Sequence, residues 1–249
     1  MKLIIQNIAT EYTDEGSGPV ILCLHGWKDS LHTFDSLKPA LLKKGRVIAL
    51  DLPGFGETGN PPGAWQVNDY VQFVANFLQK MNVDADFLVG HSFGGRVIIK
   101  GLGEGKLRAK KVVLIAAAGI VPEKTWRSRL VAIVSRVAAV FFRIPPFHFL
   151  RNKIRTIFYK IIGSDYLNAG ALQETFVKII AEDLSDYARR ITIPTLLIWG
   201  KHDKATPLAT AEKLHALIPD SRLEVFPDAA HFVHHEKAVE VGSLIEGFL

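Results

Sequence analysis

Residues 87–97 read FLVGHSFGGRV, an apolar run that stops at a serine set among glycines and then becomes apolar again. At a sharp turn between a strand and a helix, a serine takes a strained backbone conformation. Side chains two positions to either side would collide with the neighbouring strand and helix. The pattern Gly-x-Ser-x-Gly therefore predicts a strand, a tight turn that presents Ser92, and a helix from Arg96 onward. The residues that shape this turn are Gly90, His91, Gly94 and Gly95.

Two later segments supply the groups that a nucleophilic serine needs. A serine hydroxyl reacts poorly until a histidine removes its proton, and that histidine needs a carboxylate to fix its tautomer and stabilise its charge. The apolar run 195–199 leads to Asp203, and the run 223–226 leads to His231. Because the carboxyl ends of parallel strands meet at one edge of a sheet, we expect both to lie beside Ser92. Asp228 is the competing acid, but a position three residues before His231 on the same loop does not orient it towards the imidazole.

The strand pattern predicts the fold class. Eight short β-rich runs alternate, after the first two, with helix-like segments. This pattern predicts an α/β fold with a mostly parallel eight-stranded sheet that is covered by helices on both faces. The eight runs are Leu3–Ile5, Ile8–Tyr12, Val20–Leu24, Arg46–Leu50, Phe87–Val89, Lys111–Ile115, Thr195–Trp199 and Leu223–Phe226.

The alternation stops between residues 121 and 187. We interpret this stretch as a helical cap inserted into a core domain of residues 1–120 and 188–249. Residues 121–190 hold 12 Lys or Arg against 6 Asp or Glu, so the chain's net charge of +5 is local to this segment. We find no nucleic-acid motif there and expect no nucleic-acid partner. The apolar run Leu130–Phe142 is too short to span a bilayer. A lid over a pocket is our first interpretation of it, and an amphipathic helix resting on a membrane surface is the alternative.

Composition limits the remaining classes. With 249 residues, 48% of them hydrophobic and 22% charged, the chain can bury a large core. Its first residues, Met-Lys followed by three apolar residues, lack the apolar region of a signal peptide, and we expect a cytoplasmic protein. The only cysteine, Cys23, lies in an apolar run and is expected to be a buried thiol. No His-Glu-x-x-His spacing accompanies His202, His234 and His235, so no metal or cofactor is expected.

With these residues in view, the chain resembles the α/β-hydrolase superfamily along nearly its whole length, apart from the cap. Two further motifs contribute to the resemblance. The first is expected to shape an oxyanion loop and the second to support that loop. They are His25-Gly26-Trp27 after the third predicted strand and Asp51-Leu-Pro-Gly-Phe-Gly56 after the fourth.

The resemblance implies a mechanism that agrees with the residue chemistry. Ser92 would attack an acyl carbon, His231 would act first as base and then as acid, and Asp203 would hold the imidazole. The negative charge that forms on the carbonyl oxygen needs preorganised donors. The family places these donors at the backbone N–H groups of Trp27 and Phe93.

The sequence defines the type of bond that is cleaved less sharply than it defines the catalytic residues. A serine at position 92 disfavours epoxide hydrolases and haloalkane dehalogenases, which carry an aspartate there, and a carboxylesterase-like serine hydrolase is our leading hypothesis. Carbon–carbon bond hydrolases of the meta-cleavage type are similar in size and cap position, but they usually show Gly-Pro-Gly where this chain has Trp27-Lys-Asp-Ser30. Cofactor-free perhydrolases share His-Gly-Trp but usually continue with proline, where Lys28 stands. A slow-turnover receptor or scaffold on the same fold is the alternative from a different class.

The cap also suggests the kind of substrate. Its many apolar and aromatic residues favour a small-molecule ester with a lipophilic group, and we expect Trp126, Phe141 and Phe142 to line the pocket. The sequence is compatible with a monomer or a homodimer.

Overall fold

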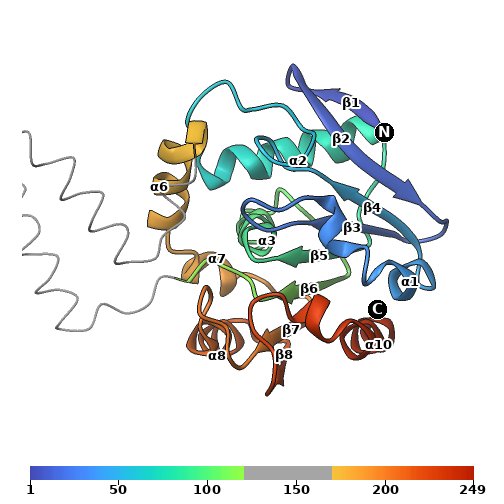
Figure 1. Cartoon of the computed structure of the whole chain (residues 1–249), viewed down its shortest axis with the longest axis vertical. Coiled ribbons are helices and arrows are strands. Elements are labelled where there is room, and N and C mark those ends of the chain that lie inside the picture. The colour runs from blue at the N-terminus through green and yellow to red at the C-terminus, as the bar shows by residue number, and fades with distance from the viewer. Residues whose placement is uncertain (121–169) are drawn as a thin grey trace, which may run out of the picture. The chain divides into compact units, whose positions relative to one another are not determined.

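The computed structural model describes residues 1–120 and 170–249, and in them eight strands form one sheet in the order β1-β2-β4-β3-β5-β6-β7-β8. β1 pairs antiparallel with β2, which pairs antiparallel with β4, and every other pairing is parallel (Figure 1). The predicted mostly parallel eight-stranded sheet is confirmed. The strands are β1 (Lys2–Ile5), β2 (Ile8–Glu15), β3 (Val20–Leu24), β4 (Arg46–Leu50), β5 (Phe87–His91), β6 (Lys111–Ile115), β7 (Thr195–Gly200) and β8 (Ser221–Phe226).

Helices cover both faces of the sheet (Figure 1). On one face lie α2 (Val67–Met81), α3 (Phe93–Gly103) and α8 (Leu208–Leu217). On the other lie α1 (Lys38–Leu42) and α10 (Ala238–Phe248). The short helices η1 (Leu31–Phe34) and α9 (Val233–Glu236) contribute residues to the same apolar cluster as α1 and α10. Such two-sided cover removes a parallel sheet from water on both faces, which explains why the inner strands are apolar throughout.

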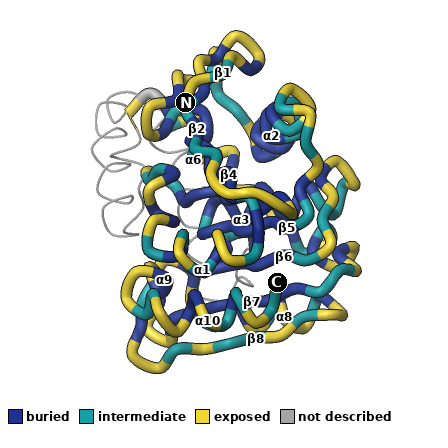
Figure 2. Tube along the Cα trace, turned by 90° about the vertical axis from the view of Figure 1, so that its right-hand side faces the viewer, coloured by how far each residue is buried: buried dark blue, intermediate teal, exposed yellow. Residues whose placement is uncertain are grey.

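The core follows the inner strands. All five residues of β3 and all five of β5 are buried, whereas β8 at the edge of the sheet is only partly buried (Figure 2). Cys23 in β3 belongs to an apolar cluster with Phe34 of η1 and Leu41 of α1. Burial raises the pKa of the Cys23 thiol far above its usual range, so the predicted buried thiol is unreactive at neutral pH.

The chain divides into two compact units, one made of Met1–Val121 and Lys178–Leu249 and the other of Pro122–Val177. The first contains the whole sheet. Before β7 the described chain forms the short helix η4 (Gly170–Leu172), α6 (Gln173–Ala181) and α7 (Ser185–Ala188). The predicted cap, residues 121–187, falls mostly outside the described residues and stays a prediction. Trp126, Phe141 and Phe142 also lie outside them.

The segment that begins at residue 178 is held to α3 by hydrogen bonds and an ion pair. One guanidinium nitrogen of Arg96, Nη1, donates to the carbonyl oxygens of Ile179 at 2.6 Å and of Glu182 at 2.8 Å. Lys100, one turn further along α3, forms an ion pair with the Glu182 carboxylate. Arg96 and Lys100 are buried, and a buried cation requires such partners. None of the described helices is long and apolar enough to cross a bilayer.

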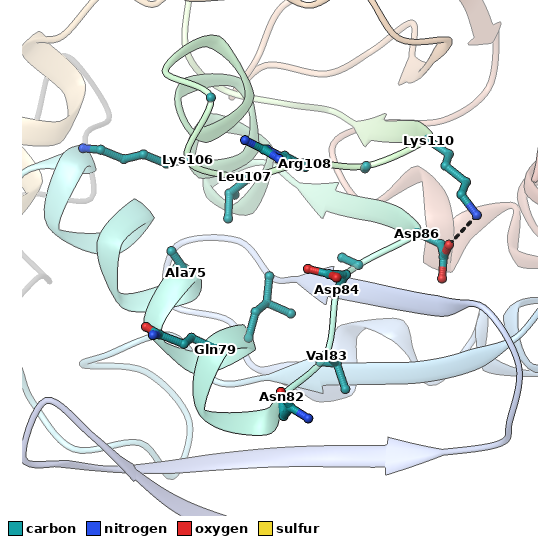
Figure 3. Close-up of a pocket in the computed structure, with 14 residues that line it drawn as sticks. Ala75, Gln79, Asn82, Val83, Asp84, Asp86, Lys106, Leu107, Arg108 and Lys110 are labelled. Carbon is teal, nitrogen blue, oxygen red and sulfur yellow. Dashed lines mark ion pairs between the residues drawn. The ribbon is translucent and has the colours of Figure 1, made fainter.

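A surface hollow of ≈ 1160 Å³ lies at the amino ends of β5 and β6 (Figure 3). Its walls are the carboxyl end of α2 and the loops that precede the two strands. They carry charges of both signs, including the ion pair between Lys110 and Asp86 at 2.7 Å. Ser92 follows the opposite, carboxyl end of β5, so this hollow is separate from the predicted catalytic residues.

Candidate active site

Ser92 occupies a turn of a single residue, because β5 ends at His91 and α3 begins at Phe93. The predicted helix start at Arg96 is wrong by three residues: Gly94 and Gly95 already belong to the helix despite the low helix propensity of glycine. Ser92 has φ 49° and ψ −108°, a backbone conformation that residues other than glycine rarely adopt. Its N–H donates to the carbonyl of Ile115 at 3.0 Å, and this bond helps to hold the strained turn.

The three glycines around the turn are steric requirements. A Cβ atom at Gly94 would lie 1.9 Å from the carbonyl oxygen of Leu24. One at Gly95 would lie 2.5 Å from Cβ of Ala117, and one at Gly90 would lie 2.7 Å from the backbone nitrogen of Gly95. The glycine pattern therefore reflects close packing of β3, β5 and α3 around Ser92.

Gly94→Ala is expected to destabilise the fold by more than about 3 kcal/mol or to prevent folding, because a backbone carbonyl in a central strand cannot move aside for the new methyl group. Urea unfolding monitored by circular dichroism measures the change. Gly63→Ala is the matched control, since a Cβ at Gly63 meets nothing within 4 Å. Equal unfolding midpoints for the two variants would contradict this steric explanation.

The three residues expected to form a triad lie together at the carboxyl edge of the sheet. Nε2 of His231 lies 3.1 Å from Oγ of Ser92, and Nδ1 lies 2.8 Å from Oδ2 of Asp203. A carboxylate only accepts, so Nδ1 carries the hydrogen and Nε2 presents a lone pair to the Ser92 hydroxyl. The competing acid lies elsewhere: the Asp228 side chain is 78% exposed and faces Lys237 at 3.9 Å.

Asp203 is held by its own loop. Its Oδ1 accepts the N–H groups of Ala205 at 2.8 Å and Thr206 at 2.9 Å, and its Oδ2 lies 2.7 Å from the Thr206 hydroxyl. Burial raises the pKa of Asp203, but the hydrogen bonds from His231 and Thr206 outweigh it and hold the pKa below its ordinary value. The carboxylate is therefore charged at neutral pH and fixed in direction. Thr206 was not predicted; its only sequence signal is Asp-x-x-Thr, a common local side-chain turn.

The predicted oxyanion donors lie on two segments that meet beside Ser92. Phe93 is the first residue of α3, where backbone N–H groups have no acceptor within the helix and the helix dipole favours negative charge. Trp27 follows β3, and its ring meets the Phe93 ring edge to face, with the centroids 5.6 Å apart. The loop after β3 and the start of α3 thus lie against each other.

His25 fixes the loop that contains Trp27. Its Nε2 accepts the N–H of Leu52 at 2.9 Å, so in the neutral ring Nδ1 donates to the carbonyl of Gly26 at 2.7 Å. Burial lowers the pKa of His25, which favours this neutral form. Asp51 supports the same region by accepting the N–H of Leu31 at 2.7 Å. The second motif therefore contacts the predicted oxyanion loop and the helix that follows it.

Comparison with known proteins shows the family of the chain. The family model described as the alpha/beta hydrolase fold matches residues 19–238. The chain belongs to the α/β-hydrolase fold family. The resemblance found in the sequence is thereby confirmed, and the protein is a hydrolase of this family. The family does not by itself define the bond that is cleaved.

Individual relatives of this α/β-hydrolase have different activities. It is 28% identical to the 2-hydroxy-6-oxo-6-(2'-aminophenyl)hexa-2,4-dienoic acid hydrolase of Metapseudomonas resinovorans, over 97% of this chain and 88% of that protein. An esterase from Exiguobacterium antarcticum matches with TM-score 0.74 at 22% identity, covering 99% of this chain and 98% of the other. A meta-cleavage product hydrolase from Pseudomonas fluorescens IP01 matches with TM-score 0.74 at 24% identity, covering 100% and 96%. The two structural likenesses show the fold alone.

Beside Ser92, this α/β-hydrolase has an aromatic wall. The rings of Trp27 and Phe55 meet edge to face at 4.8 Å, and those of Tyr70 and Phe93 do so at 4.9 Å. Phe55 belongs to the 51–56 motif that was expected to support the oxyanion loop, whereas Tyr70 of α2 was not predicted from the sequence. Phe55, Tyr70 and Phe93 are buried and Trp27 is partly buried, so these rings form a packed support beside the predicted oxyanion donors.

The remaining histidines of this α/β-hydrolase near the site have structural contacts. The hydroxyl oxygen of Thr33 lies 2.9 Å from Nε2 of His234 and 3.0 Å from Nε2 of His235. His202 is exposed on the loop before Asp203. In the described part of the chain, no group of three or more His, Cys, Asp or Glu side chains is arranged to hold a metal ion.

Proposed function

We propose that this α/β-hydrolase cleaves carboxylic esters through an acyl-enzyme formed on Ser92. The observation that carries the proposal is the continuous chain from Oδ2 of Asp203 through His231 to Oγ of Ser92, with contacts of 2.8 Å and 3.1 Å. Both distances lie within hydrogen-bond reach, and the tautomer fixed by Asp203 leaves Nε2 free to accept the serine proton.

The reaction proceeds in two balanced halves. Oγ of Ser92 attacks the ester carbon while Nε2 of His231 takes the hydroxyl proton, and the oxyanion accepts hydrogen bonds from the N–H groups of Trp27 and Phe93. The intermediate collapses to an acyl-enzyme, and His231 returns the proton to the departing alcohol. A water molecule then repeats the sequence, releasing the carboxylic acid and restoring Ser92. Asp203 orients the imidazole and stabilises its charged form throughout.

The aromatic wall supports the choice of substrate class. Trp27 is only partly buried and packs against Phe93, the residue after Ser92, and an apolar group at this position suits a small ester with a lipophilic acyl or alcohol group. The expected contributions of Trp126, Phe141 and Phe142 stay predictions, as do the cytoplasmic location, the monomeric or homodimeric state and membrane contact through the basic segment.

Purified protein is expected to hydrolyse p-nitrophenyl esters of short to medium acyl chains, and a chelator such as EDTA should leave the rate unchanged, because the proposed chemistry needs only Ser92, His231 and Asp203. Release of p-nitrophenolate measures the rate. A rate that EDTA abolishes and a divalent metal restores would contradict the proposal.

Cleavage of a carbon–carbon bond is the second candidate. It is supported by the relative from Metapseudomonas resinovorans, which is named as a hydrolase of a 2-hydroxy-6-oxo-dienoic acid. Measuring kcat/KM for a p-nitrophenyl ester and for a 2-hydroxy-6-oxo-hexa-2,4-dienoate distinguishes the two candidate functions. Cleavage of the dienoate is followed by the loss of its conjugated chromophore. A clear preference for the dienoate would replace ester cleavage as the proposed function. Binding of either compound without turnover would favour the receptor or scaffold.

A further inference from the structure

His91, which immediately precedes the nucleophile, contacts both the loop that carries His231 and the loop that contains Trp27. Its ring is buried, with 1% of the residue exposed. From the sequence, His91 was predicted only to help shape the tight turn at Ser92. Nothing in the proposed acyl transfer uses the imidazole, although burying a ring with two polar nitrogens is costly unless those nitrogens find partners.

One nitrogen of His91 binds the backbone of the catalytic histidine. Nε2 of His91 lies 3.2 Å from the carbonyl oxygen of His231. A carbonyl only accepts, so Nε2 carries the hydrogen and donates it. The two imidazole rings also pack together, with the centroids 4.9 Å apart. This contact joins residues 140 positions apart in the sequence.

The other nitrogen faces the loop that contains the predicted oxyanion donor Trp27. Nδ1 of His91 lies 3.7 Å from Oδ2 of Asp29, and in the described chain neither atom has a hydrogen-bond partner. A Cβ atom at Gly26 would lie 3.0 Å from the same Nδ1, so the ring packs directly against the loop backbone. Burial lowers the pKa of His91, while Asp29 opposes this effect.

Two further aromatic rings hold His91 from its other sides. The His234 ring lies 4.4 Å from it between centroids, and the Phe232 ring lies 5.2 Å away. Since Phe232 directly follows His231 in the chain, the loop that carries the catalytic histidine contacts His91 through both a carbonyl and a side chain. The orientation of the His91 ring is therefore determined by its surroundings.

We propose that His91 is a positioning residue that fixes the backbone of His231 relative to Ser92 and to the oxyanion loop. The inference rests on the proposed acyl transfer. The contact between Nε2 of His231 and Ser92 Oγ is 3.1 Å, and a modest displacement of the His231 backbone would break it. Because misplacement by about 1 Å can cost about 10²-fold in rate, a single backbone hydrogen bond at this point has a large effect on turnover.

Three substitutions separate the roles of the two nitrogens. His91→Gln places an amide donor within reach of the His231 carbonyl, where Nε2 stands. His91→Asn is shorter and places its amide only on the Asp29 side, where Nδ1 stands, so it cannot donate to the His231 carbonyl. His91→Met fills a similar volume and donates to neither. If the bond to the His231 carbonyl positions the base, His91→Gln should retain most of the wild-type kcat. In His91→Asn and His91→Met, kcat should fall by between about tenfold and 10²-fold, while KM stays nearly unchanged.

The readout combines p-nitrophenyl ester kinetics with the rate at which a fluorophosphonate labels Ser92. Labelling needs the activated serine but no particular natural substrate. A wild-type protein that is not labelled would contradict the proposed function itself. A labelled wild type with His91→Asn and His91→Gln equally active, or with losses confined to KM, would overturn the positioning role. His215→Met, an exposed change on α8, is the matched control and should react like the wild type. Should His91→Met fail to fold, the Gln and Asn pair still decides.

Discussion

Ser92→Ala is expected to lower kcat for ester hydrolysis by on the order of 10⁶-fold, the scale at which loss of a triad nucleophile acts. The variant keeps the backbone of the turn and removes only the oxygen that lies 3.1 Å from Nε2 of His231. Without that oxygen no acyl-enzyme can form. Steady-state turnover of a p-nitrophenyl ester, together with the mass of the intact protein after exposure to a fluorophosphonate, measures both consequences.

Ser243→Ala provides the matched control for this experiment. Its hydroxyl is exposed on α10 and donates only to the carbonyl of Val239, so the same change should leave both the rate and the labelling intact. Undiminished turnover in Ser92→Ala would remove Ser92 from the mechanism. A mass adduct that persists in that variant would mean that the probe reacts at another residue.

Asp203→Asn is expected to lower kcat by up to about 10⁴-fold, by analogy with the triad of serine proteases. The loop geometry gives a local reason. Oδ1 accepts two backbone N–H groups, from Ala205 and Thr206, so this position must remain an oxygen in the variant. The amide nitrogen is then forced to the place of Oδ2, where it donates to Nδ1 of His231. The imidazole would carry its hydrogen on Nε2 and could no longer take the proton of Ser92.

Asp228→Asn is the comparison that tests this assignment. Asp228 is exposed and lies beside Lys237, so its loss should change kcat far less. Residual activity of Asp203→Asn should rise with pH as hydroxide replaces the base. If Asp228→Asn were the crippling change and Asp203→Asn nearly silent, the assignment of the acid would be wrong, although Ser92 and His231 could keep their roles.

The sequence predicted the features that local pattern determines. Strand positions agree with the structure within a few residues, because apolar runs bounded by turn residues specify them. The positions of Asp203 and His231 followed from the rule that loops after parallel strands share one edge of the sheet. The start of α3 was missed because glycine weakens a helix signal even where packing demands it.

The missed features depend on segments that are distant in the sequence. Thr206 binds Asp203 through a short local turn that resembles many other loops. Tyr70 reaches the site only because helix α2 folds back against Phe93. The contact of His91 with the His231 carbonyl bridges 140 positions, and no periodicity or spacing in the chain encodes it.

Arg96 lies one helical turn after the nucleophile, and its guanidinium holds the carbonyls of Ile179 and Glu182. The helix that presents Ser92 is thus also the attachment point of the chain that returns after residues 122–177. This arrangement defines a natural junction for exchanging segments between members of the family. A chimaera that replaces residues 122–177 leaves both carbonyls and the Lys100 ion pair in place. A chimaera that replaces residues 122–182 instead removes the two carbonyls and the Glu182 carboxylate. The buried cations Arg96 and Lys100 would then face an unrelated segment.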